Sequence, residues 1–363
     1  MKKALLLIPA FTLYFANSFS QATFTTGALQ VDINEYGRVE LYSASGTQQL
    51  ERASILVGSA STAVFDYQND AEQNEPTELV ASPLHSDFEI YGAYDNTYSN
   101  EPPDVLVKLN AFGWTDKGFI IVRFNITNRE MLSMDAIAGL DIIPYLDETW
   151  GYDTVSYDFD GNMIRFHRGA GVNMGIKLLS APLASLYSFE WYDGYYVDSD
   201  YYNWMTNGSI QPYYYSNTGD GPVTITSQAP VNIDNGESFN VDYVLALGYD
   251  EDELIANMNE AEIFYDILVT SNKDLASSEF RLMNTPNPVV SSTEISYNLP
   301  VSGFVNLKVY DATGNTVAQL VNENQASGSH RVSFDTSKLS SGIYTYKLQV
   351  NGQIITKKLI VNK

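Results

Sequence analysis

The sequence predicts an all-β protein, in which a large antiparallel β-sandwich of two sheets with one closing helix is followed by a small Ig-like β-sandwich. Two observations predict this class. The 363 residues include 26 tyrosines and 17 phenylalanines, and aromatic residues, like Thr, Val and Ile, favour strands. Apolar and polar residues also alternate over short runs bounded by Gly and Asn, which is typical of half-buried strands joined by tight turns.

Charge and cysteine content restrict the partners and the chemistry. The net charge is −24 and the chain has no cysteine. Nucleic acids and anionic lipid surfaces attract basic proteins, so neither is an expected partner. Without cysteine there is no disulfide framework and no thiolate metal site. Burial and backbone hydrogen bonds must therefore hold the fold.

The first 20 residues predict a secretory signal peptide. Two lysines follow the initiating Met, and the apolar run at 4–16 is too short to span a membrane as a mature helix. Ser18 and Ser20 stand three and one residues before a cut ahead of Gln21. We therefore expect cleavage between Ser20 and Gln21, and an exported protein that is not an integral membrane protein.

Charge divides the mature chain. Residues 21–270 hold 38 acidic and nine basic side chains, a net charge of −29, whereas residues 286–363 hold four and seven, a net charge of +3. A break of this size predicts two units with different roles. Residues 271–285 lack sustained periodicity and run into prolines, so they are predicted to be the linker.

Three stretches of the acidic body predict pairs of strands. Residues 28–44 and 104–130 each contain two runs joined at a glycine, and residues 221–249 contain two more around Asn235-Gly236. Within 119–127, apolar residues occupy every second position, which places one strand face in a core. An all-β unit of this length is expected to be a sandwich of two large sheets.

One helix is predicted after Tyr249. Asp250 can cap its start, and acidic residues at 251–253 favour the positive end of the helix dipole. The apolar stripe that follows consists of Leu254, Met258, Ala261 and Tyr265. The acidic run could instead be a metal or partner site, but capping explains it without a further assumption.

Residues 286–363 predict the small Ig-like sandwich, because six short strand-like runs are separated by turn signals. Its features in chain order are Pro286-Asn287-Pro288, TEISYNLP (293–300), VYDATGNTV (309–317), GSHRVSFDTSKLSSGIYTYKL (328–348) and the basic KKLIV (357–361). In order and spacing they resemble the type A C-terminal sorting domain of the type IX secretion system of the Bacteroidota.

This resemblance implies a route of export. Such domains are carried across the outer membrane and removed by a sortase-like peptidase, and the mature protein is released or attached to surface lipopolysaccharide. The implied partners are the secretion machinery and that peptidase, and the expected location is extracellular or the outer-membrane surface. The candidate sorting-signal residues are Pro286, Pro288, Gly342, Tyr344, Lys357 and Lys358. Gly342 and Tyr344 could equally be turn and packing residues, and the unit could be an ordinary adhesive Ig-like domain.

Aromatic residues crowd into the stretch 186–215 of the body, with acidic residues between them. Exposed rings can stack on the apolar faces of sugars, while carboxylates bind hydroxyls, and Tyr supplies both a ring and a polar tip. The candidate ligand-binding residues are Trp191, Tyr195, Tyr196, Tyr202 and Trp204. Alternatively, these rings fill strands and cover a sheet edge.

A catalytic site has weaker support in the sequence. Arg165 and His167 fall on one face of a predicted strand, and a carboxylate such as Glu190 could join them in acid–base work on a sugar ring oxygen. A histidine of this kind is also often structural. Asp158 and Asp160 have the alternating spacing of a calcium loop, with Gly161 to turn. A hairpin turn is the alternative, and no other cofactor is expected.

The order of elements in the body is similar to that of the β-sandwich modules of mutarotase-like and carbohydrate-associated proteins. That order is paired strands, an NITN strand, a Tyr-rich middle, an NGESFNVDYVLALG strand and a closing helix. The expected function is a non-catalytic module that binds extracellular carbohydrate. Two alternatives stay open. One is a carbohydrate-active enzyme of epimerase, lyase or hydrolase type, and the other is a structural surface protein.

Overall fold

The computed structural model describes residues 21–363, apart from residues 170, 193, 281, 300–301, 312–314 and 351–352 and the side chains of 270–280 and 353–354. The predicted signal peptide, residues 1–20, lies outside the described residues, and so does Ser20 of its predicted cleavage site.

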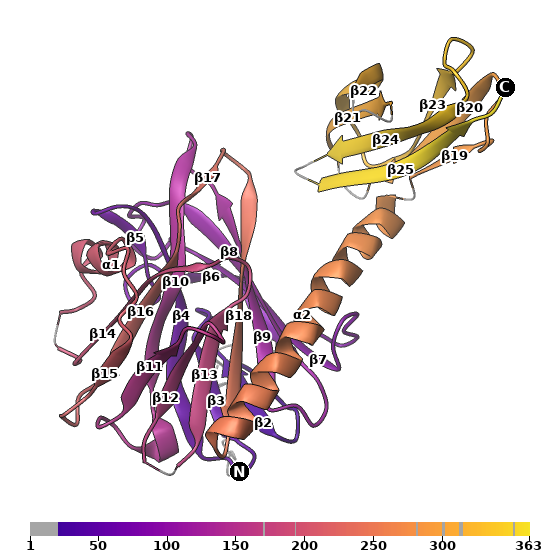
Figure 1. The fold of residues 1–363 in the computed structure, drawn as a ribbon. Helices are drawn as coiled ribbons and strands as arrows, with labels where there is room; N and C mark the ends of the chain where they lie inside the picture. The colour runs from indigo at the N-terminus through magenta and orange to yellow at the C-terminus, as the bar shows by residue number, and fades with distance from the viewer. Residues whose placement is uncertain are drawn as a thin grey trace, which may run out of the picture.

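The body is a sandwich of two nine-stranded antiparallel sheets (Figure 1). The first sheet has the order β1 (Ala22–Thr25), β2 (Leu29–Ile33), β3 (Val39–Ser43), β4 (Gln48–Ala60), β10 (Met134–Pro144), β16 (Val223–Gln228) and β14 (Leu183–Phe189), with β5 (Ala63–Phe65) on β4 and β17 (Val231–Ile233) on β10. The second sheet has the order β15 (Tyr213–Tyr215), β11 (Thr154–Asp158), β12 (Met163–His167), β13 (Asn173–Leu178), β18 (Ser238–Gly248), β9 (Phe119–Asn128), β8 (Val105–Gly113), β7 (Phe88–Asp95) and β6 (Glu72–Leu79).

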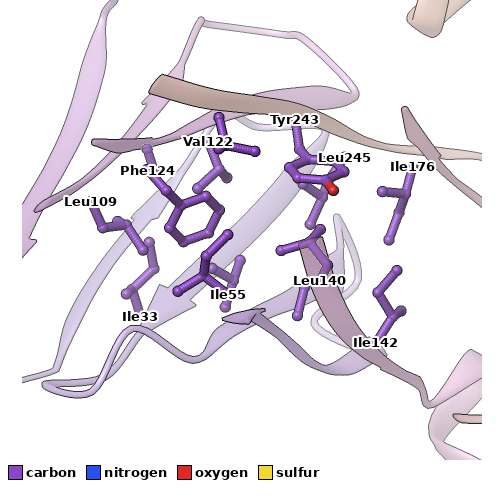
Figure 2. Close-up of a cluster of buried hydrophobic side chains, with 14 of the residues drawn as sticks. Ile33, Ile55, Leu109, Val122, Phe124, Leu140, Ile142, Ile176, Tyr243 and Leu245 are labelled. Atoms are coloured by element: carbon purple, nitrogen blue, oxygen red, sulfur yellow. The ribbon is translucent and has the colours of Figure 1, made fainter. Parts of the chain in front are cut away.

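The main core lies between these sheets. Figure 2 shows Val122 and Phe124 of β9 facing Ile55 of β4, while Leu140 of β10 faces Leu245 of β18. The alternation predicted for β9 is confirmed, because its even-numbered residues from Ile120 to Ile126 are buried in this core. Each fully buried side chain of this size contributes about 1.5–3 kcal/mol.

Helix α2 (Glu251–Phe280) closes the body over the outer face of the second sheet (Figure 1). The predicted cap is confirmed, since Asp250 Oδ1 accepts the backbone N–H of Glu253 over 2.9 Å. Leu254, Met258 and Ala261 are buried against β9 and β18. The helix extends to Phe280, so the predicted linker at 271–285 begins as helix.

A second helix, α1 (Asp198–Met205), was not predicted. Aromatic residues favour strands, but Asp198 and Asp200 lie in the first turn, where they complement the helix dipole. Tyr201 and Met205, four residues apart, are both buried against the outer face of the first sheet. Packing has overridden the local preference of the tyrosines.

The C-terminal residues form the expected small sandwich with a core of its own. One sheet has the order β19 (Met283–Thr285), β20 (Ser292–Leu299) and β23 (Gly328–Asp335), and the other β22 (Thr316–Gln325), β21 (Gly303–Tyr310), β24 (Gly342–Val350) and β25 (Gln353–Val361). The predicted fold class is therefore confirmed for both units.

Candidate functional site

The predicted aromatic segment is divided between the interior and the surface. Tyr195 is buried, Tyr202 and Trp204 are half-buried, and Trp191 and Tyr196 are exposed. The rings stack on one another, with the centroids of Phe189 and Trp204 4.2 Å apart. Most of the cluster thus packs α1 against the first sheet, and only the exposed rings offer a face to a ligand.

A buried charge pair holds this segment in place. Arg52 Nη2 lies 2.6 Å from Asp141 Oδ2, and the Tyr201 hydroxyl donates to the same oxygen over 3.2 Å. The Tyr195 hydroxyl contacts both charged partners. Burial and the Asp141 carboxylate raise the pKa of Tyr201 well above its usual value, so its hydroxyl stays protonated and can donate.

Glu190 fastens the end of β14 to the segment after β15. Its two carboxylate oxygens accept hydrogen bonds from the Tyr214 hydroxyl (3.0 Å), the Asn217 backbone (3.2 Å), the Ser216 hydroxyl (3.0 Å) and the Thr218 hydroxyl (2.7 Å). Burial opposes ionisation, but hydrogen bonds led by that from Thr218 lower the pKa of Glu190. The carboxylate is therefore an ionised anchor with its oxygens already bonded.

Arg165 and His167 lie on the outer face of the second sheet, near a different carboxylate. Arg165 Nη1 is 2.6 Å from Glu251 of α2, and its Nε donates to Asn173 over 2.9 Å. Burial, followed by the Arg165 charge, lowers the pKa of His167, while Glu251 opposes the shift. Among the described residues, no hydrogen bond or ion pair joins Glu190 to His167 or Arg165.

Strand register places two exposed tyrosines beside this pair. Tyr215 is paired with Thr154, and Thr154 with His167. Two residues along, Ser156 is paired with both Tyr213 and Arg165. Cross-strand partners share a sheet face, so these residues form one surface, which we call the β15 face. Its members are Tyr213, Tyr215, Thr154, Ser156, Arg165 and His167.

The rings of the β15 face are open to solvent. Tyr213 is 60% and Tyr215 50% exposed, whereas Tyr214 between them turns inward to Glu190. Helix α2 crosses the same sheet over β13, β18 and β9, and leaves β15 and β11 to its side (Figure 1). The sequence marked these tyrosines as part of the aromatic run, but it did not indicate that they lie beside His167.

Asp158 and Asp160 lie at the turn between β11 and β12, which pair as a hairpin from Asp158 and Met163. Asp158 Oδ1 accepts the backbone N–H of Asp160 over 3.0 Å. Within the described part of the chain, no three acidic or histidine side chains gather in a way that could hold a metal. Calcium binding stays a prediction.

The predicted sorting-signal residues lie around the last strand, β25. Val289, next to Pro288, pairs with Val361, and Asn287 accepts the backbone N–H of Ile360 over 2.9 Å. Gly342 is paired with Val361 in the ladder between β24 and β25. The carbonyl oxygen of Pro286 accepts a hydrogen bond from the Thr293 hydroxyl, and the Tyr344 hydroxyl donates one to the carbonyl oxygen of Ser340.

Lys357 and Lys358 are exposed on β25, an edge strand of its sheet. Which of them the export machinery contacts stays a prediction.

Comparison with known families identifies this unit. Residues 285–362 match the family described as the secretion system C-terminal sorting domain. The chain therefore carries a type IX sorting domain, and the protein is exported to the cell surface or beyond the cell. Among the described residues, no helix is long and apolar enough to cross a membrane.

The body is similar in fold to solved structures of low sequence identity. A bacterial glucoamylase complexed with acarbose matches at a TM-score of 0.51 and 13% identity, over 66% of this chain and 34% of that one. A putative aldose 1-epimerase from Escherichia coli K12 matches at a TM-score of 0.39 and 11% identity, over 63% of this chain and 99% of that one. The chain thus spans about a third of the glucoamylase. A search of curated protein sequences finds no match.

Proposed function

We propose that the body is a non-catalytic module that binds extracellular carbohydrate through the β15 face. The observation that carries this proposal is the pair of solvent-exposed rings of Tyr213 and Tyr215 on one face of an edge strand. Aromatic rings with a polar tip suit the apolar faces and hydroxyls of sugars. Ser156, Arg165 and His167 add hydrogen-bonding groups on the same face.

The proposed ligand is a neutral glycan. The body carries a net charge of −29 over residues 21–270, and like charges disfavour the approach of sulfated or uronic acid polymers. The guanidinium on this face is already paired with Glu251, so it offers little attraction to an anionic sugar. Neutral plant, fungal or bacterial polysaccharides fit these charges best.

The test is a glycan-array screen of the full chain beside a Tyr213→Ala/Tyr215→Ala variant. The matched control is Tyr98→Ala, which removes a ring of 69% exposure in the loop after β7. We expect binding to neutral glycans that the double variant loses and the control keeps. A Trp191→Ala/Tyr196→Ala variant tests the rings predicted from the sequence. Absence of binding by the folded wild-type chain would overturn the proposal.

A carbohydrate-active enzyme is the second candidate. The observation in its favour is that a histidine of lowered pKa lies beside Arg165 and Glu251, on the face that carries the exposed rings. A neutral imidazole can accept a proton from a sugar hydroxyl. Incubation of each bound glycan with wild-type and His167→Gln protein, followed by NMR of the anomeric protons, tests it. Chemical change that His167→Gln abolishes would favour the enzyme.

A further inference from the structure

The loop that precedes β11 exposes two more aromatic rings. Trp150 is 45% and Tyr152 52% exposed, and the centroids of the Tyr145 and Trp150 rings are 4.3 Å apart. Two residues after Tyr152, Thr154 pairs with Tyr215 of the β15 face. The loop and the β15 face are therefore adjacent through the backbone.

This loop has an unusual backbone conformation. Asp147, Glu148 and Tyr152 have φ values of 52°, 54° and 59°, in the left-handed region that side chains disfavour. Gly151 has a φ of 70°, and a Cβ built there would lie 2.0 Å from the carbonyl oxygen of Thr218. Such conformations persist only where the surroundings fix them, and they concentrate at functional sites.

Polar contacts fix the loop from both sides. Arg168 donates to the carbonyl oxygens of Thr149 (2.8 Å) and Gly151, and its Nε lies 2.8 Å from the buried Asp153. The buried side chain of Gln49 exchanges two hydrogen bonds with Asp147, of 3.0 and 3.1 Å.

The loop is also joined to the segment that directly follows β15, the strand that carries the exposed tyrosines. Tyr152 donates its backbone N–H to Thr218 over 3.0 Å, and Ser216 donates to the carbonyl of Asp153 over 3.0 Å. Glu190 holds the hydroxyls of the same Ser216 and Thr218. The rings of the loop therefore sit on a backbone that is fixed relative to β15.

We propose that Trp150 and Tyr152 form a second aromatic subsite, continuous with the β15 face, so that the surface binds several consecutive sugars of a polysaccharide. This inference rests on the proposed function. A pre-organised loop loses little conformational freedom on binding, which favours affinity. Arg168 is the positioning residue of this subsite, since it holds the carbonyls on both sides of Trp150.

The test measures affinity against chain length. The full chain is titrated with cello-, xylo-, manno- and malto-oligosaccharides from dimer to hexamer. Trp150→Ala/Tyr152→Ala is expected to weaken hexamer binding about tenfold and to leave dimer binding within about twofold. Arg168→Ala is expected to produce the same length-dependent loss, which general destabilisation would not. Thermal melts confirm that each variant is folded.

The outcomes separate the two proposals. If the affinity for the hexamer depends on Tyr213 and Tyr215 but not on Trp150 and Tyr152, the proposal of a second subsite is wrong and the proposal of binding at the β15 face is retained. Equal losses for dimer and hexamer in the Trp150→Ala/Tyr152→Ala variant would also overturn the second subsite. If the wild-type chain binds none of the four series and no array glycan, both proposals fail.

Discussion

Arg52 and Asp141 form an ion pair of 2.6 Å beneath helix α1, where both side chains are almost completely shielded from water. The two strands that carry them, β4 and β10, are neighbours in the middle of the first sheet. Tyr195 and Tyr201 reach the same pair from the aromatic segment. The position of that segment therefore depends on one buried charge pair.

Asp141→Ala should destabilise the body strongly, because it leaves the buried guanidinium without its partner. We expect the free energy of unfolding to fall by about 3–5 kcal/mol. Tyr201→Phe, which removes a single donor to the same carboxylate, should cost about 1 kcal/mol. Urea denaturation of both variants measures the difference. Similar small losses in the two would show that the charge pair is dispensable.

The buried Asp66 should make stability depend on pH. Burial, with a smaller effect of the neighbouring Asp70, raises the pKa of Asp66 to about 7 despite hydrogen bonds from Asn69. Between about pH 4 and 7 the unfolded carboxyl is ionised while the folded one keeps its proton. Unfolding then releases a proton, so the contribution of Asp66 to stability is lost as the pH rises through this window.

Asp66→Asn removes that ionisation. Relative to wild type, the variant should be more stable at pH 8 than at pH 5, by about 1.4 kcal/mol for each pH unit between 5 and the folded pKa of Asp66. The matched control is Asp87→Asn, because Asp87 is exposed and hydrogen bonds from Thr115 lower its pKa. Thermal melts at the two pH values measure the effect. An equal difference from wild type at both values would contradict it.

Much of the fold could be predicted because its signals are local. The alternation in β9 and the Asp250 cap of α2 each depend on a few consecutive residues, and both are confirmed. Helix α1 could not be predicted in this way, because its tyrosines favour strands in isolation. Its stability depends on Tyr201 and Met205 packing against a sheet whose strands lie elsewhere in the sequence.

The candidate site was harder to predict because it depends on long-range pairing. Arg165 and His167 were expected on one face, and they share it. The carboxylate beside them is Glu251, about 85 residues further along the chain, and no sequence pattern selects it among 44 acidic residues. The proximity of Tyr215 to His167 likewise follows only from the order β15, β11, β12.

Gly139 of β10 should tolerate no side chain. A Cβ built on it would lie 1.7 Å from the backbone oxygen of Thr226 on the neighbouring strand β16. Gly139→Ala must push the two strands apart, and we expect a loss of about 1–3 kcal/mol in the free energy of unfolding. Gly219→Ala is the control, because a Cβ built on Gly219 would meet no atom of the described residues within 4 Å. Chemical denaturation that ranks the two equally would refute the argument.

We expect the export machinery to recognise the basic strand β25. Lys357 and Lys358 are exposed on this strand, whose outer edge is already bonded to Asn287 and Val289 from Lys358 onward, so the two charged side chains are what the strand offers to a partner. We expect Lys357→Glu/Lys358→Glu to leave most of the protein in the periplasm of a host with a type IX secretion system, as deletion of residues 286–363 should. Lys338→Glu changes an exposed lysine between β23 and β24 and should be secreted normally. Immunoblots of periplasm, cell surface and medium measure the distribution. Normal secretion of the double variant would mean that the fold of the domain, and not the charge of its last strand, is recognised.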